Sequence, residues 1–149
     1  MLSYSPDLYW HGTVAIEWKR SSIMKQYIDG YVLPVPKKNL ASYKKMAAQA
    51  GKIWMKHGAL KYIECAGDDL KSAAKWGGLS FMKMANATSN ETIIFAFVVY
   101  KSRTHRDRVN TKVMKDPVMN DPKNKDIPIP FEMKKLAYGG FASIVNYER

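Results

Sequence analysis

The fold is decided by the stretch Tyr27-Ile28-Asp29-Gly30-Tyr31-Val32-Leu33-Pro34-Val35-Pro36-Lys37. Its residues alternate, with Ile28, Gly30 and Val32 on one side and Tyr27, Asp29 and Tyr31 on the other, which is typical of a strand with two different faces. The two prolines remove backbone donors, so we expect the strand to stop at them and to lead through a stiff turn.

The bulk properties of the chain indicate one domain. It has 149 residues, a formal net charge of +11 and a single cysteine, Cys65. One cysteine excludes an internal disulfide and a cysteine-based zinc site, and it is consistent with a reducing cytoplasm, where we expect the protein to reside. The longest apolar run, Ile93–Tyr100, has the length of a strand, so no membrane partner is expected.

Residues 1–23 differ from the rest because they show no clear helical or strand period. We interpret them as a poorly ordered N-terminal extension, or as sequence upstream of a true start at Met24. Residues 24–149 are predicted to form the single domain, and the extension is expected to contribute little to its core.

Beyond Lys37 the apolar period changes from two residues to three and four, which predicts a long amphipathic helix up to His57, followed by Gly58 as its C-cap. Further strands are predicted at 59–67, 92–100 and 136–147. A second helix is predicted from Ser102 to about Lys115, and its exposed basic stripe reads as a solvated face. The connection 68–91 is predicted to be irregular, and connections of that length often cover a site.

This order of elements favours an α+β fold of the ferredoxin-like βαββαβ type. In that plan two helices cover one face of a four-stranded antiparallel sheet and leave the other face bare. We expect a second copy of the chain to cover the bare face, giving a homodimer with facing sheets, a dimeric α/β barrel. The side chains expected on that face are Leu60, Tyr62, Ile94, Val98, Tyr138 and Ile144.

Several motifs resemble the YbaA-like family of small uncharacterised bacterial proteins. They are the stretch from Tyr27 to Lys38, His57-Gly58-Ala59-Leu60, Val99 to Arg103, His105 to Asn110, and Tyr138-Gly139-Gly140-Phe141. The resemblance covers residues 24 to about 145 and implies a dimeric α/β-barrel fold. It implies no established activity, so no catalytic residue is assigned from it.

A ligand pocket is predicted from strand positions that share one register. Asp29, Tyr31, Tyr62, Glu64 and Tyr138 would line the cavity between the facing sheets, with Arg106 and Trp76 toward its rim. Carboxylates beside phenols are costly to enclose without a polar purpose, and burial would suit one of them to proton transfer. The alternatives are local: Asp29 bonded to backbone or a lysine, Glu64 paired at the dimer seam, and Arg106 in an ordinary ion pair.

Two classes of function remain open. The first is a protein that binds an unknown small molecule in the barrel cavity, with a cofactor-independent enzyme as one version of it. The second is a protein that uses its basic surface to bind RNA or another polyanion. We favour the first, because no RNA-recognition motif is present, although nucleic acid stays open as a partner. The histidine spacing predicts no metal site, and the glycine pairs predict no nucleotide cofactor.

Overall fold

The computed structural model of this protein describes residues 25–148, and the predicted extension, residues 1–23, lies outside them. Four strands, β1 (Tyr27–Pro36), β2 (Lys61–Ala66), β3 (Glu91–Tyr100) and β4 (Ala137–Ala142), form one antiparallel sheet. Their order across the sheet is β2-β3-β1-β4, and β2 and β4 are its two edges. The sheet is open, and the protein has the predicted α+β class.

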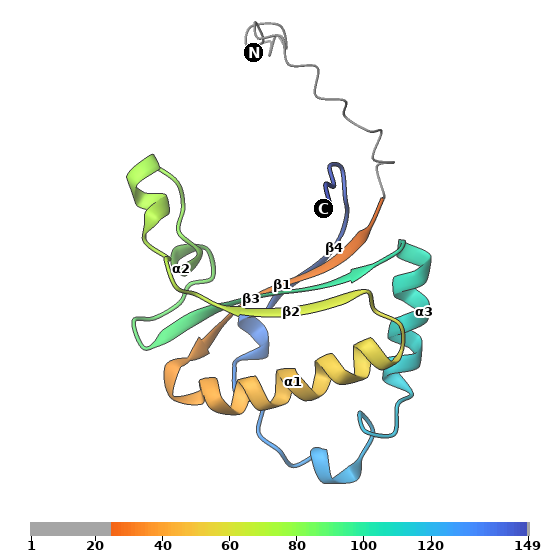
Figure 1. Ribbon diagram of the computed structural model, residues 1–149. Helices are drawn as coiled ribbons and strands as arrows, with labels where there is room; N and C mark the ends of the chain where they lie inside the picture. Colours follow the sequence, from red (N-terminus) through yellow and green to blue (C-terminus); the bar gives the residue numbers. More distant parts are fainter. Residues whose placement is uncertain (1–24, 149) are drawn as a thin grey trace, which may run out of the picture.

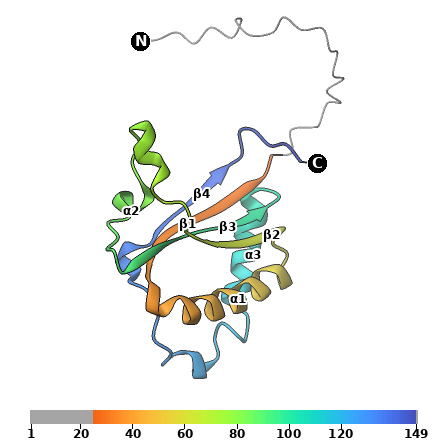
Figure 2. The same ribbon diagram turned by 60° about the vertical axis from the view of Figure 1, so that its left-hand side comes forward.

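Two long helices, α1 (Leu40–Lys56) and α3 (Arg103–Met114), lie on one side of the sheet (Figures 1 and 2). The connection between β2 and β3 rises on the opposite side and carries a 3-10 turn, Ser72–Trp76, and a single helical turn, α2 (Phe81–Met84). As predicted, Ser102 caps α3, because its hydroxyl accepts a hydrogen bond from the His105 amide. No helix within residues 25–148 is long and apolar enough to cross a bilayer.

β1 ends at Pro36, the second of the two prolines, as predicted, and Pro34 lies inside the strand. β3 pairs with β1 as far as Pro36, whereas β4 pairs with it only as far as Val32. In an antiparallel sheet, the backbone groups of every second residue point to the same neighbouring strand. The Lys37 amide donates to the carbonyl of Asn90, next to β3, so the even-numbered residues of β1 point toward β4. Pro34 therefore faces the side where β4 has ended, so its missing donor removes no ladder bond.

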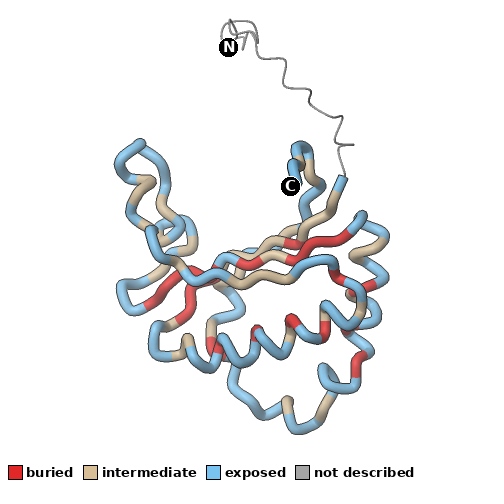
Figure 3. Tube along the Cα trace, in the orientation of Figure 1, coloured by how far each residue is buried: buried red, intermediate tan, exposed pale blue. Residues whose placement is uncertain are grey.

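The core lies between the sheet and the two long helices (Figure 3). One cluster joins Leu33, Val35 and Ile94 of the sheet to Tyr43 and Ala47 of α1. A second joins Val98 and Tyr100 to Ile53 of α1 and to Val109 and Val113 of α3. Burying a side chain of this size stabilises the fold by about 1.5–3 kcal/mol, so these contacts fix both helices on one face of the sheet.

The other side of the sheet is the open face, defined here by the outward residues Ile28, Val32, Ile63, Cys65, Phe95, Phe97 and Phe141. Phe95 and Phe141 are 46% and 60% exposed. The prediction for this face was wrong for Tyr62, Ile94, Val98 and Tyr138, which the strand registers place on the helix side. The physical reason is that α3 brings polar partners to the helix side, so the polar strand register lies beneath it.

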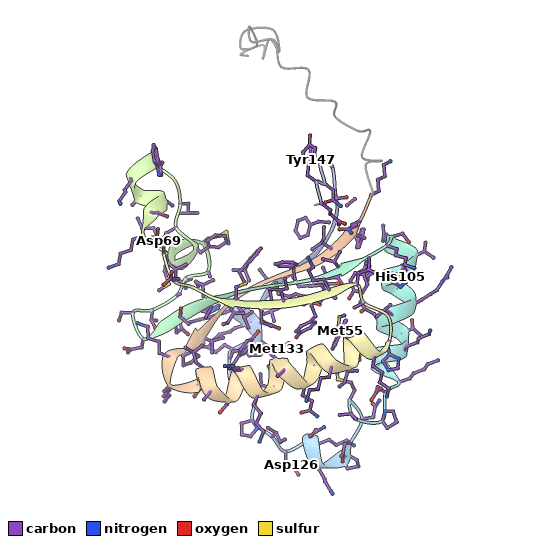
Figure 4. The ribbon with its side chains drawn as sticks, in the orientation of Figure 1. Met55, Asp69, His105, Asp126, Met133 and Tyr147 are labelled. Carbon is purple, nitrogen blue, oxygen red and sulfur yellow. The ribbon has the colours of Figure 1, made fainter. Side chains whose placement is uncertain are left out.

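Two segments rise above the open face at opposite ends (Figures 1 and 4). The connection 68–90 carries the exposed Trp76, Leu79 and Met84, and Phe81 in it contacts Phe95 of the sheet. The C-terminal segment carries the exposed Ile144 and Val145, and Figure 4 shows Tyr147 at its tip. Exposed apolar side chains therefore lie on the open face and on the two segments that rise at its ends.

A carboxylate joins the ends of the two long helices. Asp116 is buried after α3, and its carboxylate accepts hydrogen bonds from Lys56 at 2.8 Å and from the amide of Val118 at 2.9 Å. The Nε2 atom of His57 lies 2.7 Å from the same carboxylate. The Lys56 ammonium first, then His57 and the Val118 amide, hold the pKa of Asp116 below its ordinary value.

We expect Asp116→Asn to destabilise the protein at neutral pH, and we expect that difference to shrink in acid. The folded-state pKa is depressed, so the ionised carboxylate stabilises the fold above the unfolded-state pKa of about 3.9, and this stabilisation is lost as the pH falls below it. Urea unfolding between pH 7 and pH 2.5 measures it. Asp126→Asn, at an exposed loop position, is the control. A difference that grows in acid would contradict the prediction.

Candidate functional site

The predicted pocket residues lie in two adjacent rows across the helix side of the sheet. In one row Tyr138, Tyr31, Ala96 and Glu64 are successive cross-strand partners. In the next row Gly140, Asp29, Val98 and Tyr62 are partners. The shared register of these residues was predicted correctly, but they face the helices and not the open face. Within each row the buried Ala96 or Val98 separates the β1 residues from those of β2.

On the β1 side of these rows, Asp29 has no solvent exposure and is held by α3. Its Oδ1 accepts a hydrogen bond from Arg106 Nη1 at 3.1 Å, and its Oδ2 accepts from Asn110 Nδ2 at 3.4 Å. Arg106 also donates to the Tyr138 hydroxyl at 2.7 Å, and its guanidinium lies 5.0 Å from the centre of the Tyr27 ring. This network contains an ion pair within the chain, as the local alternative for Arg106 stated, whereas Asp29 bonds Arg106 and Asn110 and not backbone or a lysine.

The Arg106 network continues into the core through aromatic side chains. The hydroxyl of Tyr100 and the indole of Trp54 both donate to Asn110 Oδ1, each at 3.2 Å. Gly140 allows the close approach of Tyr27, because a Cβ there would collide with the tyrosine hydroxyl. Gly140 therefore lets the Tyr27 side chain lie close against the backbone of β4. Nearly every polar group in the network already has a partner, which makes it a structural element of the fold.

On the β2 side, Glu64 is held differently. Its Oε2 accepts a hydrogen bond from the Tyr43 hydroxyl at 2.8 Å, and its Oε1 accepts from the Tyr62 hydroxyl at 2.7 Å. Glu64 makes no ion pair with any residue in 25–148. Burial and then the Glu64 carboxylate raise the pKa of both phenols. Both phenols therefore stay protonated and remain donors to Glu64 at ordinary pH.

A groove of about 620 Å³ opens beside Glu64, between α1 and β2. It exists because the facing positions of α1 are small, Ala47, Ala48 and Gly51, as is Ala66 of β2. At Gly51 the helix lies so close to the sheet that a Cβ would be 2.8 Å from the Tyr62 ring. Figure 4 shows Met55 between α1 and β2 at the same groove. Apart from Lys44 and the Glu64 group, its walls are apolar.

The structure separates the remaining predicted residues from this groove. Tyr138 lies on the opposite edge strand, β4, and stacks on Tyr31 with ring centres 4.9 Å apart. Trp76 is 87% exposed on the connection that rises on the far side of the sheet, so it lies away from this groove. That connection packs on the open face and not beside the helices.

Sequence reasoning missed Tyr43, which we had counted only as part of the apolar helix stripe. A tyrosine in a buried helical stripe needs a partner for its hydroxyl, and the strand carboxylate Glu64 is that partner. The role of Asn110 in holding Asp29 was not predicted either. Within residues 25–148 no group of three or more His, Cys, Asp or Glu side chains is placed to hold a metal ion.

Comparison with known proteins identifies a family whose function is described as unknown. The model of the family described as "Protein of unknown function (DUF1428)" matches residues 26–133. The chain is 36% identical over 122 residues to the uncharacterized protein YbaA of Escherichia coli strain K12 and equally to that of Shigella flexneri. Each match covers 81% of this chain and 98% of the relative. Both relatives are described as uncharacterized, so neither description gives a substrate.

Proposed function

The chain belongs to the DUF1428 family, as its YbaA-like motifs predicted, and because that family has no known function we propose one from the geometry. We propose that the protein binds a small molecule in the groove between α1 and β2. The supporting observation is that Glu64 faces an apolar groove, is held by two phenols and pairs with no cation among residues 25–148. Ligand sites commonly combine apolar walls with a few placed polar groups, and a volume of about 620 Å³ lies in their usual range.

The geometry favours this groove over the Asp29 network as the binding site. Asp29 is fully buried and its charge is balanced by Arg106, so a ligand has no free group to meet there. Glu64 keeps free acceptor capacity, because each carboxylate oxygen accepts only one of the hydrogen bonds that it can take. The proposed site therefore retains Tyr62 and Glu64 from the predicted pocket and adds Tyr43.

We also propose that the protein works as a homodimer through its open face. The strand order β2-β3-β1-β4 fits the ferredoxin-like plan, in which that face needs a cover. Lys61 and Glu91 are the charged residues in the outward strand register, and both lie at strand ends, so the net charge of +11 does not concentrate there. The exposed apolar side chains of the segments at both ends suit a second copy, since a two-fold partner would bring the same segments toward this sheet.

The binding proposal is tested by filling the groove. Ala48 is exposed and lines the groove, so the indole of Ala48→Trp would occupy it without entering the core. We expect small apolar molecules of a screening library, whether cationic, neutral or anionic, to include members that shift the NMR amide signals of Ala48, Gly51 and Glu64. Ala48→Trp should weaken their binding at least about tenfold, or about 1.4 kcal/mol.

The matched control is Ala41→Trp, an equally exposed alanine of α1 outside the groove lining, which should bind as the native protein does. Thermal melting checks that both variants fold. The proposal fails if no library member moves these signals, or if Ala48→Trp binds as tightly as Ala41→Trp.

A further inference from the structure

The chemical class of the ligand follows from the hydrogen bonds already made at Glu64. Tyr43 and Tyr62 each donate their one hydroxyl proton to Glu64. The side-chain oxygens of these three residues therefore offer lone pairs and no proton to an incoming molecule. A ligand that approaches the Glu64 carboxylate has to donate hydrogen bonds, and a carboxylate or phosphate placed there would meet acceptors.

The charge of the site indicates the same class. Glu64 is half-buried and makes no ion pair within the described part of the chain, residues 25–148. Lys44 lines the groove, but its ammonium forms no ion pair with Glu64. A carboxylate in such a place attracts an external cation more strongly than one in open water, because screening is weaker there.

The aromatic rings beside Glu64 are a further feature of the groove that favours a cationic ligand. Tyr43 and Tyr62 both line the groove and hold the carboxylate, so aromatic rings lie near its charge, and aromatic rings attract cations by their quadrupole. Beyond them the groove is walled by Leu40, Ala47, Ala48, Met55 and Ile94. The site thus has a negative polar end and an apolar body.

We propose that the groove binds a primary ammonium compound with an apolar body, its ammonium on Glu64 and its apolar part between α1 and β2. This inference rests on the proposed function, because it names the ligand class of the same groove. It assigns to Glu64 the role of a specificity residue, and to the two phenols the role of holding the carboxylate in place.

Three probes of one shape test the proposal: octylammonium, 1-octanol and octanoate, titrated calorimetrically into the native protein. We expect octylammonium to bind at least about tenfold more tightly than octanol, and octanoate to bind more weakly than octanol. The amide signals of Ala48 and Glu64 report whether each probe enters the groove. These comparisons need no variant, so they do not depend on how a substitution folds.

The variant Glu64→Gln keeps the shape of the side chain and removes its charge. It should reduce octylammonium binding to the level of octanol and leave octanol within about twofold of its native value. The control is Glu132→Gln, which changes the net charge equally at an exposed position outside the groove lining and should leave all three probes unchanged.

The possible failures are distinguishable. If octanol or octanoate enters the groove as tightly as octylammonium, or if Glu64→Gln keeps the tenfold preference, the ligand class is wrong while groove binding stands. If none of the three probes shifts the groove signals at millimolar concentration, and the screening library gives no binder either, the proposed function fails together with the inference.

Discussion

Asp29→Ala is expected to lower the free energy of unfolding by about 3 kcal/mol, the largest effect we predict for a single substitution of a polar residue. The substitution leaves the Arg106 guanidinium, whose side chain is only 15% exposed, without its buried carboxylate. Removing one partner of a buried pair typically costs about 3–5 kcal/mol, and the lower end applies because Arg106 lies near the edge of the sheet. For a domain of this size the melting temperature should fall by about 10 °C.

The test includes a variant that removes both charges. Asp29→Leu combined with Arg106→Met replaces the pair by apolar side chains of similar size, and it should recover more than half of the lost stability. Urea unfolding of the single and double variants forms the measurement. If the double variant is as unstable as Asp29→Ala, the loss comes from packing and not from an uncompensated charge. A loss below about 1 kcal/mol in Asp29→Ala would show that Arg106 turns into solvent.

The order of the elements could be predicted from the sequence, because it depends on short-range patterns. The alternation from Tyr27 to Val32 and the helical period after Lys37 both appear as β1 and α1. Pro36 marks the end of β1 as predicted, whereas Pro34 is tolerated inside the strand because of the neighbour that it faces. Pro34 lies where β4 has already ended, and pairing lengths of that kind are set by tertiary structure.

The register of the candidate site was predictable, but its side was not. Alternation places Asp29 and Tyr31 on one face and Ile28 and Val32 on the other, and it does not say which face the helices cover. The usual assumption puts the apolar register under the helices. Here α3 brings Arg106 and Asn110 to meet Asp29, so the register that carries Asp29 and Tyr31 is the covered one. Ile28 and Val32 are left on the outer side, where a partner would be needed.

The final prediction follows from that exposed register. In solution we expect a dimer at micromolar concentration, and we expect Phe95→Asp to weaken its association at least about a hundredfold. Phe95 lies in the open face, with ring centres 5.8 Å from Phe97 and 6.3 Å from Phe81. In a two-fold interface the substitution acts twice, and each copy would bury a carboxylate against an apolar partner. Sedimentation velocity across a concentration series measures the association.

The control is Ile127→Asp, which adds the same charge at a side chain that is 62% exposed. Ile127 follows Asp126, which Figure 4 places in the loop beneath the helices, away from the open face. It should leave the dimer intact, and both variants should keep the native melting temperature of the isolated domain because neither side chain is fully buried. A native protein that sediments as a monomer at micromolar concentration would contradict the dimer. If Phe95→Asp remained as dimeric as Ile127→Asp, the interface would lie elsewhere, and the apolar face would then need another partner to cover it.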